Sequence, residues 1–258
     1  MPVISRIQEM LRLAEGNNRL FPATILFNEG WLLRLVLGWF SQASANEQPI
    51  TFGPGATWFS EALLPSQFLP RSRRDQLGEG WTHADGVIGN VTIGSSTLAD
   101  VKLMPDSTQL VVTEAKLFSR LSRRVTNAAY FDQAARNVAC LAEVLCRAAR
   151  RPEQLLSLGF FVVAPSEQIT AGVFSAEMKK ASLREKVARR VDEYSDPRKE
   201  QWLHEWYLPT LERTRIESVP WETLVAHIQL QDPDFGNELA AFYSRCLKFN
   251  RLQEPEQI

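Results

Sequence analysis

Residues 109–117 read QLVVTEAKL, and this stretch decides the fold prediction. Leucine and β-branched residues dominate it, a composition typical of a strand. Glu114 and Lys116 follow at positions i and i+2, so both side chains leave the same face of that strand. Burying a single charge is costly. An ionisable pair at the end of an apolar strand therefore indicates a functional site.

The segments around this strand predict an α/β protein. Residues 126–150 carry one apolar stripe at helical spacing, and residues 159–165 form a short apolar run between Gly and Pro, which is typical of a strand buried on both faces. Upstream, the patterns predict helices at 23–42 and 57–68 and strands at 86–94 and 98–104. The predicted order is therefore helix, three meandering strands, helix and buried strand.

Composition and charge narrow the class of protein. The chain has 258 residues, 45% of them hydrophobic, and 29 basic against 30 acidic residues give a net charge of −1. These values exclude a disordered or coiled-coil protein. No apolar run is long enough to span a membrane, the first residues lack the apolar core of a signal peptide, and the three cysteines form no CxxC pair. We therefore expect a cytoplasmic protein with no membrane partner.

A third charge stands upstream of the Glu114/Lys116 pair. Asp100 lies 14 residues before Glu114, across a predicted hairpin. With an odd number of residues in the turn, Asp100 faces Glu114; with four, it faces the other side of the sheet. On the first register, two carboxylates and an ammonium group meet, which suits Mg²⁺ or Mn²⁺. Lys116 would then orient a water molecule or neutralise charge on a phosphate.

The pattern Asp100-x13-Glu114-Ala115-Lys116 resembles the motif of the PD-(D/E)XK, or restriction-endonuclease-like, nuclease superfamily. Tyr130-x2-Gln133 is similar to the glutamine-containing helix of its exonuclease-type branch. The resemblance covers residues 23–165. It implies a restriction-endonuclease-like αβββαβ core with a mixed central sheet flanked by helices, and Mg²⁺-dependent hydrolysis of nucleic-acid phosphodiesters, with DNA the expected substrate. Asp100, Glu114, Lys116 and Gln133 would be the catalytic residues.

Other carboxylates compete for the metal. Ala99 stands where the motif has proline, and Asp85 in THADGVIG is a rival to Asp100. We assign Asp100 as the primary metal ligand and Asp85 as an auxiliary ligand. The superfamily often places a glutamate on its first core helix, and both Glu29 and Glu61 qualify. We favour Glu61, because it is nearer to the strands in the sequence.

A basic track follows the motif. No acidic residue occurs from Ala115 to Phe131, and Arg side chains are common phosphate contacts. Tyr130, Gln133 and Asn137 form one polar ridge on the next helix. The predicted nucleic-acid contacts are Arg120, Arg123, Arg124, Arg136, Tyr130 and Asn137, with Arg71, Arg73 and Arg74 as a second basic cluster.

Domain organisation follows from the same patterns. Residues 1–165 are predicted to form the nuclease-like core with N-terminal helices, and residues 166–258 a mostly helical C-terminal extension packed on it as one structural unit. The alternative to an enzyme is a catalytically inactive nuclease-like domain that binds nucleic acid or a protein partner. The sequence does not distinguish DNA from RNA or internal from terminal cutting, and it does not determine the oligomeric state or the biological setting.

Overall fold

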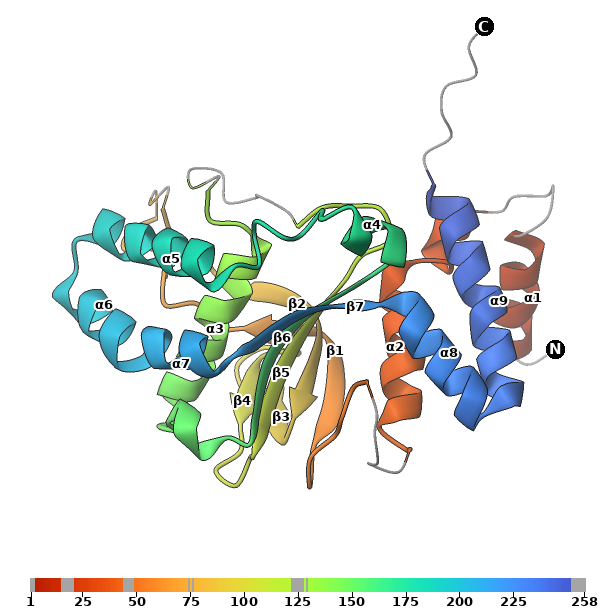
Figure 1. The fold of residues 1–258 in the computed structure, drawn as a ribbon, viewed down its shortest axis with the longest axis horizontal. Helices are drawn as coiled ribbons and strands as arrows, with labels where there is room; N and C mark the ends of the chain where they lie inside the picture. The colour runs from red at the N-terminus through yellow and green to blue at the C-terminus, as the bar shows by residue number, and fades with distance from the viewer. Residues whose placement is uncertain are drawn as a thin grey trace, which may run out of the picture.

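The computed structural model describes residues 3–14, 21–43, 49–73, 75, 77–121, 128 and 130–251. At its centre lies a five-stranded sheet in the order β1-β2-β5-β6-β7 (Figure 1). Pairing is antiparallel from β1 to β5 and parallel from β5 to β7, so the sheet is mixed. Its strands are β1 (Thr57–Leu64), β2 (Thr82–Gly89), β5 (Gln109–Ala115), β6 (Ser157–Ala164) and β7 (Arg215–Pro220).

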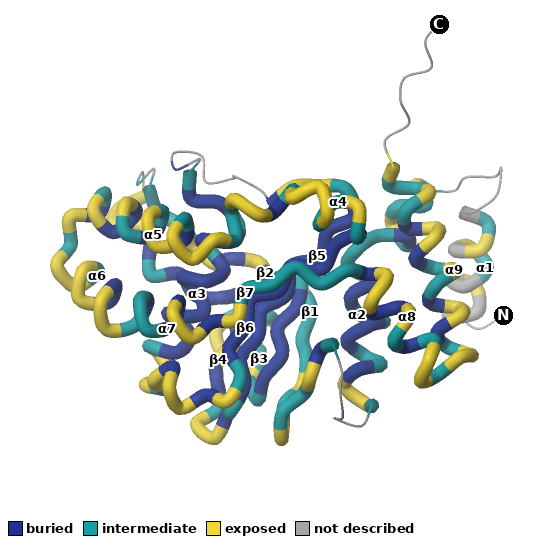
Figure 2. The backbone as a smooth tube through the Cα atoms, in the orientation of Figure 1, coloured by how far each residue is buried: buried dark blue, intermediate teal, exposed yellow. Residues whose placement is uncertain are grey.

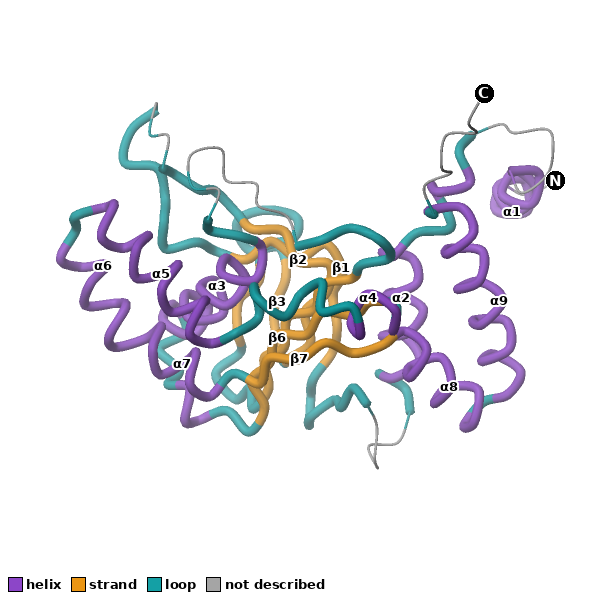
Figure 3. The backbone as a smooth tube through the Cα atoms, turned by 45° about the horizontal axis from the view of Figure 1, so that its top comes forward, coloured by secondary structure: helices purple, strands orange, loops and turns teal. Residues whose placement is uncertain are grey.

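Helices cover both faces of this sheet (Figures 1 and 3). One layer contains α3 (Gln133–Arg147), α5 (Lys180–Tyr194), α6 (Pro197–Trp202) and α7 (Leu208–Arg213), with the π-helical turn Leu203–Tyr207 between the last two. The other contains α2 (Glu29–Phe40), α8 (Trp221–Gln231) and α9 (Pro233–Asn250), and α1 (Val3–Ala14) lies on that side. The short helix α4 (Ser166–Thr170) follows β6, and 3-10 turns occur at Ala23–Ile25 and Pro152–Gln154.

The two faces of the sheet make two separate hydrophobic cores. Every residue of β5 is buried, and β5 and β6 form the dark centre of Figure 2. The α3 stripe, including Val138 and Leu141, packs on one face, while Leu33 and Leu37 of α2 pack on the other together with Trp221 of α8. The prediction of an α/β protein with a mixed central sheet flanked by helices is confirmed, including the C-terminal helices.

Two elements differ from the sequence prediction. Residues 57–64 form the edge strand β1 rather than a helix, because Trp58 and Phe59 pair with β2 while Ala62 and Leu64 enter the core beneath α3. The C-terminal region, predicted to be mostly helical, also supplies β7, which continues the sheet in parallel beside β6.

The predicted meander is interrupted at Asn90. There β2 ends, and β3 (Val91–Ile93) pairs with β4 (Val101–Leu103) in a separate two-stranded ribbon. As a result β2, and not the strand after Asp100, lies beside β5. This exchange of neighbours changes which carboxylate faces Glu114.

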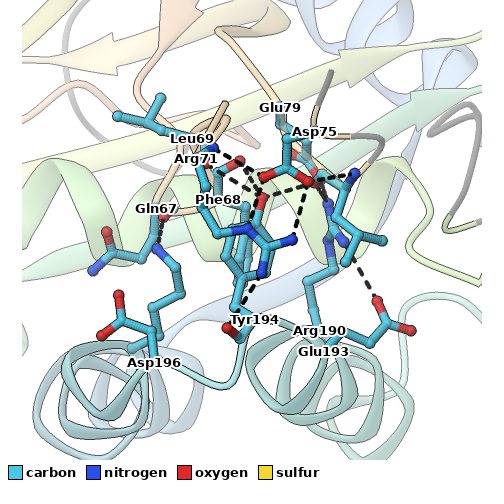
Figure 4. Close-up of polar contacts among 12 residues, drawn as sticks. Gln67, Phe68, Leu69, Arg71, Asp75, Glu79, Arg190, Glu193, Tyr194 and Asp196 are labelled. Atoms are coloured by element: carbon cyan, nitrogen blue, oxygen red, sulfur yellow. Dashed lines mark hydrogen bonds and ion pairs between the residues drawn. The ribbon is translucent and has the colours of Figure 1, made fainter. Parts of the chain in front are cut away.

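The connection from β1 to β2 is held against α5 by a buried arginine (Figure 4). Arg190 is fully buried; it donates to the carbonyl of Leu77 and makes ion pairs of 3.4 Å with both Glu79 and Glu193. Tyr194 also donates its hydroxyl hydrogen toward this connection, at 2.7 Å from the Leu77 carbonyl oxygen. We call these residues the Arg190 cluster. It fixes the loop that leads into β2.

In the part of the chain that the structure describes, no helix combines the length and the apolar character needed to cross a membrane.

Candidate active site

The candidate site lies where β2 and β5 part. Their ladder ends with the pair Gly86–Thr113. One residue further, the Asp85 carboxylate takes the place of a backbone acceptor: its Oδ2 accepts the Ala115 N–H at 2.7 Å. The carboxylate is thereby wedged between two strands, and its side chain keeps 27% of its surface exposed. This fork brings Asp85 directly beside the Glu114-Ala115-Lys116 segment.

Glu114 is the buried centre of the site, with no exposed surface. Its Oε2 accepts from Lys116 Nζ at 3.3 Å and from Gln133 Nε2 at 2.5 Å. Its Oε1 accepts from Asn137 Nδ2 at 2.7 Å. Lys116 Nζ also lies 3.9 Å from Asp85 Oδ2. The sequence prediction placed Glu114, Lys116 and Gln133 at one site, and the structure brings them together; Asn137, predicted as a nucleic-acid contact, joins them as a hydrogen-bond donor.

When Asp85 and Glu114 are both ionised, negative charge is in excess at this point. Two carboxylates face a single ammonium group, and one of them is removed from water. Burial and the negative charge of Asp85 raise the pKa of Glu114 to about 8, against the opposing pull of Lys116. A cation bound between two such carboxylates would stabilise their ionised forms.

The backbone of Lys116 is held at both ends by the α/β framework. Its N–H donates to the Val163 carbonyl of β6 at 2.8 Å, and its carbonyl accepts from Trp221 Nε1 at 2.8 Å. Trp221 is fully buried at the start of α8. Sequence reasoning missed this contribution of the C-terminal region, because no motif marks a tryptophan that bonds to a carbonyl 105 residues away.

The position of α3 follows from its N-terminal cap. Asp132 accepts the Ala135 N–H at 3.0 Å, which is the standard side-chain cap of a helix start. Lys186 of α5 bonds to the same carboxylate at 2.6 Å. Gln133 and Asn137 lie one turn apart on the helix that begins there, so both reach Glu114.

The structure corrects the assignment of Asp100 as the primary metal ligand. Asp100 precedes β4, and that strand pairs with β3 and not with β5. The Asp100 carboxylate is buried and closes its own turn, accepting from the Ser95 hydroxyl and the backbone N–H groups of Ser96 and Thr97. These hydrogen bonds, the Ser95 hydroxyl first, hold the pKa of Asp100 well below its usual range. Asp85, predicted as an auxiliary ligand, occupies the position expected for Asp100.

Neither candidate for the helix-borne glutamate joins the pair. Glu61 lies on β1 and not on a helix; in register it is opposite Asp85, with a left-handed backbone (φ 56°). Its carboxylate forms an ion pair with Arg34 of α2 at 3.2 Å and is 56% exposed. Glu29 begins α2 and lies near Cys246, where its charge adds to burial in raising the pKa of that thiol.

Of the predicted nucleic-acid contacts, Arg120 is exposed just beyond β5. Tyr130 bonds to α5 and not to Glu114: its hydroxyl donates to Glu193 at 2.5 Å and Arg189 stacks on its ring. Arg136 lies near the buried carboxylate of Glu79. Burial raises the pKa of Glu79, and the charges of Arg190 and Arg136 offset only part of that rise. Arg123 and Arg124 lie outside the described residues.

In the second basic cluster, Arg71 forms a salt bridge of 2.8 Å with Asp75, and Arg73 is exposed. Arg74 lies outside the described residues.

The residues at the fork fit a divalent cation of the magnesium type. Such an ion binds through one or two carboxylates and keeps several waters. Asp85 and Glu114 supply two carboxylates, and within the described ranges no group of three or more His, Cys, Asp or Glu side chains is arranged to hold a metal ion. Asn137 Oδ1 adds a further oxygen: it is buried, and no described residue bonds to it.

Comparisons with protein-family models, with curated proteins and with solved structures find no match for this chain.

Proposed function

We propose that this protein is a metal-dependent nuclease of the restriction-endonuclease-like type that hydrolyses phosphodiester bonds, more readily those of DNA. One observation carries the proposal: Asp85, Glu114 and Lys116 converge at the fork between β2 and β5. Gln133 and Asn137 of the following helix bond to the central carboxylate. An acid on one strand and an acid-x-lysine triplet on its neighbour constitute the motif of that superfamily, with Asp85 in the place first given to Asp100.

Each side chain has a role that follows from its position. Asp85 and Glu114 would hold Mg²⁺ or Mn²⁺, which supplies Lewis-acid polarisation of a phosphoryl oxygen. Lys116 Nζ, close to both carboxylates, would hold the attacking water or neutralise charge that develops on the phosphate. Gln133 and Asn137 keep the Glu114 carboxylate in one orientation. Lys116 is itself placed by the bonds of its backbone to Val163 and Trp221.

The test is a cleavage assay on labelled single- and double-stranded DNA, linear and circular, and on RNA, with Mg²⁺, Mn²⁺ or EDTA. Asp85→Asn, Glu114→Gln and Lys116→Met should each lower the rate by about 100-fold or more, since each removes a group aimed at the reacting phosphate. Asp100→Asn is the matched control, because that carboxylate serves its own turn, and it should retain cleavage. Cleavage at the wild-type rate by both Glu114→Gln and Lys116→Met would disprove the proposal.

One observation favours a second candidate, a nuclease-like domain that binds nucleic acid or a protein without cutting. Glu114 has no exposed surface, and three donors already occupy its two oxygens. Titration calorimetry with Mn²⁺ separates the candidates. Binding that is lost in Glu114→Gln supports the enzyme, whereas no binding, together with nucleic-acid affinity and no cleavage, supports the inactive domain.

A further inference from the structure

A cavity of about 150 Å³ opens at the other end of α3, away from Glu114. Its walls come from three parts of the chain: Trp81 just before β2, Asp100 and Lys102 around β4, and Val144 and Arg147 of α3. A cavity of about this volume accommodates a single aromatic ring. None of these residues contacts Glu114 or Asp85 in the bonds described above, so the cavity is a separate feature.

The lining combines one flat aromatic surface with two cations. Trp81 is 39% exposed, Lys102 is exposed, and the Arg147 side chain is 47% exposed. Arg147 is held in place because its Nε donates to Glu143 at 2.7 Å. The ionised Asp100 carboxylate in the wall accepts hydrogen bonds from its own turn, whereas Lys102 is exposed and forms no ion pair with a described residue, so its charge is left to meet an anion. The lining therefore favours a flat ring that carries an anion.

Nucleotides have this chemistry. Bases stack on aromatic side chains regardless of sequence, and Lys and Arg side chains are common phosphate contacts. We propose that this cavity is a nucleotide-binding site, in which a base stacks on Trp81 and its phosphate lies at Lys102 and Arg147.

The cavity and the candidate active site lie along the same helix, α3. Asn137 at the fork and Arg147 at the cavity belong to the same helix, ten residues apart. That separation is about 15 Å along the helix axis, or about four steps of a stacked strand. The nucleotide has two sources, a free mononucleotide or one residue of a bound strand. The second source rests on the proposed nuclease function, and the first does not.

The experiment uses the whole protein in EDTA, so that metal-dependent cleavage consumes no ligand. Calorimetry measures binding of thymidine monophosphate, of thymidine, both with a single-ring base, and of a single-stranded octathymidylate. Trp81→Leu and Lys102→Met should each weaken nucleotide binding by about tenfold. The matched controls are Trp31→Leu, an exposed tryptophan on α2, and Lys179→Met, an exposed lysine before α5; both should bind as the wild type does. Circular dichroism checks that each variant is folded.

The outcomes separate the two sources. Binding of the monophosphate that depends on Trp81 and Lys102 supports a free-nucleotide site, while binding of the octamer alone with the same dependence supports a strand contact. Equal affinity for thymidine and its monophosphate would overturn the phosphate assignment. If neither ligand depends on Trp81 and Lys102, or if the control variants weaken binding equally, the proposal is wrong. Because no metal is present, these results are independent of whether the protein cuts DNA.

Discussion

The Arg190 cluster and the Glu114 site both bury charge, but they balance it differently. Around Arg190, two carboxylates, Glu79 and Glu193, are matched by Arg190 itself and by the nearby charge of Arg136. Around Glu114, two carboxylates share one ammonium group, and Asp85 is partly open to solvent. The first arrangement ties a loop to a helix, as Figure 4 shows. The second has surplus negative charge once Glu114 is ionised, and an added cation would neutralise it.

This difference separates a structural cluster from a candidate site without reference to any motif. Removing one member of a balanced buried cluster exposes an uncompensated charge to the interior, so it should affect folding most. Removing one carboxylate from a cluster with excess negative charge relieves repulsion, so it should affect folding little and metal binding greatly. The following predictions test that contrast.

The largest expected effect on stability is at Arg190. Arg190→Leu leaves Glu79 buried without its cation, and the free energy of unfolding should fall by about 3–5 kcal/mol. Urea denaturation followed by circular dichroism measures this change. Arg189→Met is the control on the same helix; the Arg189 side chain is 63% exposed, and its loss should cost less than about 1 kcal/mol. Equal losses in the two variants would show that the cluster has no special structural role.

Glu114 should show the opposite behaviour. Its pKa is raised to about 8 in the folded protein, so the folded state keeps the proton that the unfolded state releases near pH 4.5. The contribution of Glu114 to the free energy of unfolding is therefore greatest below pH 4.5, and it is lost as the pH rises from there through 8. In EDTA, Glu114→Gln should remove this decline and unfold at higher urea concentration than wild type at pH 8.5.

Urea titrations at pH 5.5, 7 and 8.5 measure the effect, and Glu153→Gln is the control, since Glu153 is exposed on the surface. A wild-type and a Glu114→Gln protein with the same dependence on pH would contradict the charge imbalance on which the site is argued.

The sequence was sufficient for those parts of the site that one element determines. Glu114 lies near the end of β5 and Lys116 directly follows that strand, while Gln133 and Asn137 share a helix, so spacing alone placed each pair on one face. The strand predicted at 159–165 from an apolar run between Gly and Pro corresponds to β6, which begins two residues earlier at Ser157.

The sequence named both Asp85 and Asp100 as candidate partners of Glu114, but it ranked them in the wrong order for a physical reason. Spacing along the chain does not determine which strands are neighbours in a sheet, and the β3–β4 ribbon is inserted between β2 and β5. Asp100 was nearer in sequence, but Asp85 is nearer in space. The edge strand β1 was missed for a related reason: its pattern resembles a helix until its pairing with β2 is known.

The smallest predicted effect on the free energy of unfolding is at Tyr130, which bonds to the Arg190 cluster and stands three residues before Gln133 of the Glu114 site. The resemblance to exonuclease-type nucleases assigned it to nucleic-acid binding, yet its hydroxyl donates to Glu193, a member of the Arg190 cluster. Tyr130→Phe keeps the ring on which Arg189 stacks and removes one hydrogen bond to a charged group, which should lower the free energy of unfolding by about 1.5 kcal/mol or slightly more.

Cleavage rate and affinity for DNA should stay at wild-type values in Tyr130→Phe, because nothing at Glu114 changes. Gln133→Ala, three residues further along and bonded to Glu114, is the contrasting variant and should lower cleavage while costing little stability. A loss of DNA affinity in Tyr130→Phe, measured in EDTA at fixed salt, would place Tyr130 on the nucleic-acid path. The boundary between the structural cluster and the site would then run between Glu193 and Tyr130, and not between Tyr130 and Gln133.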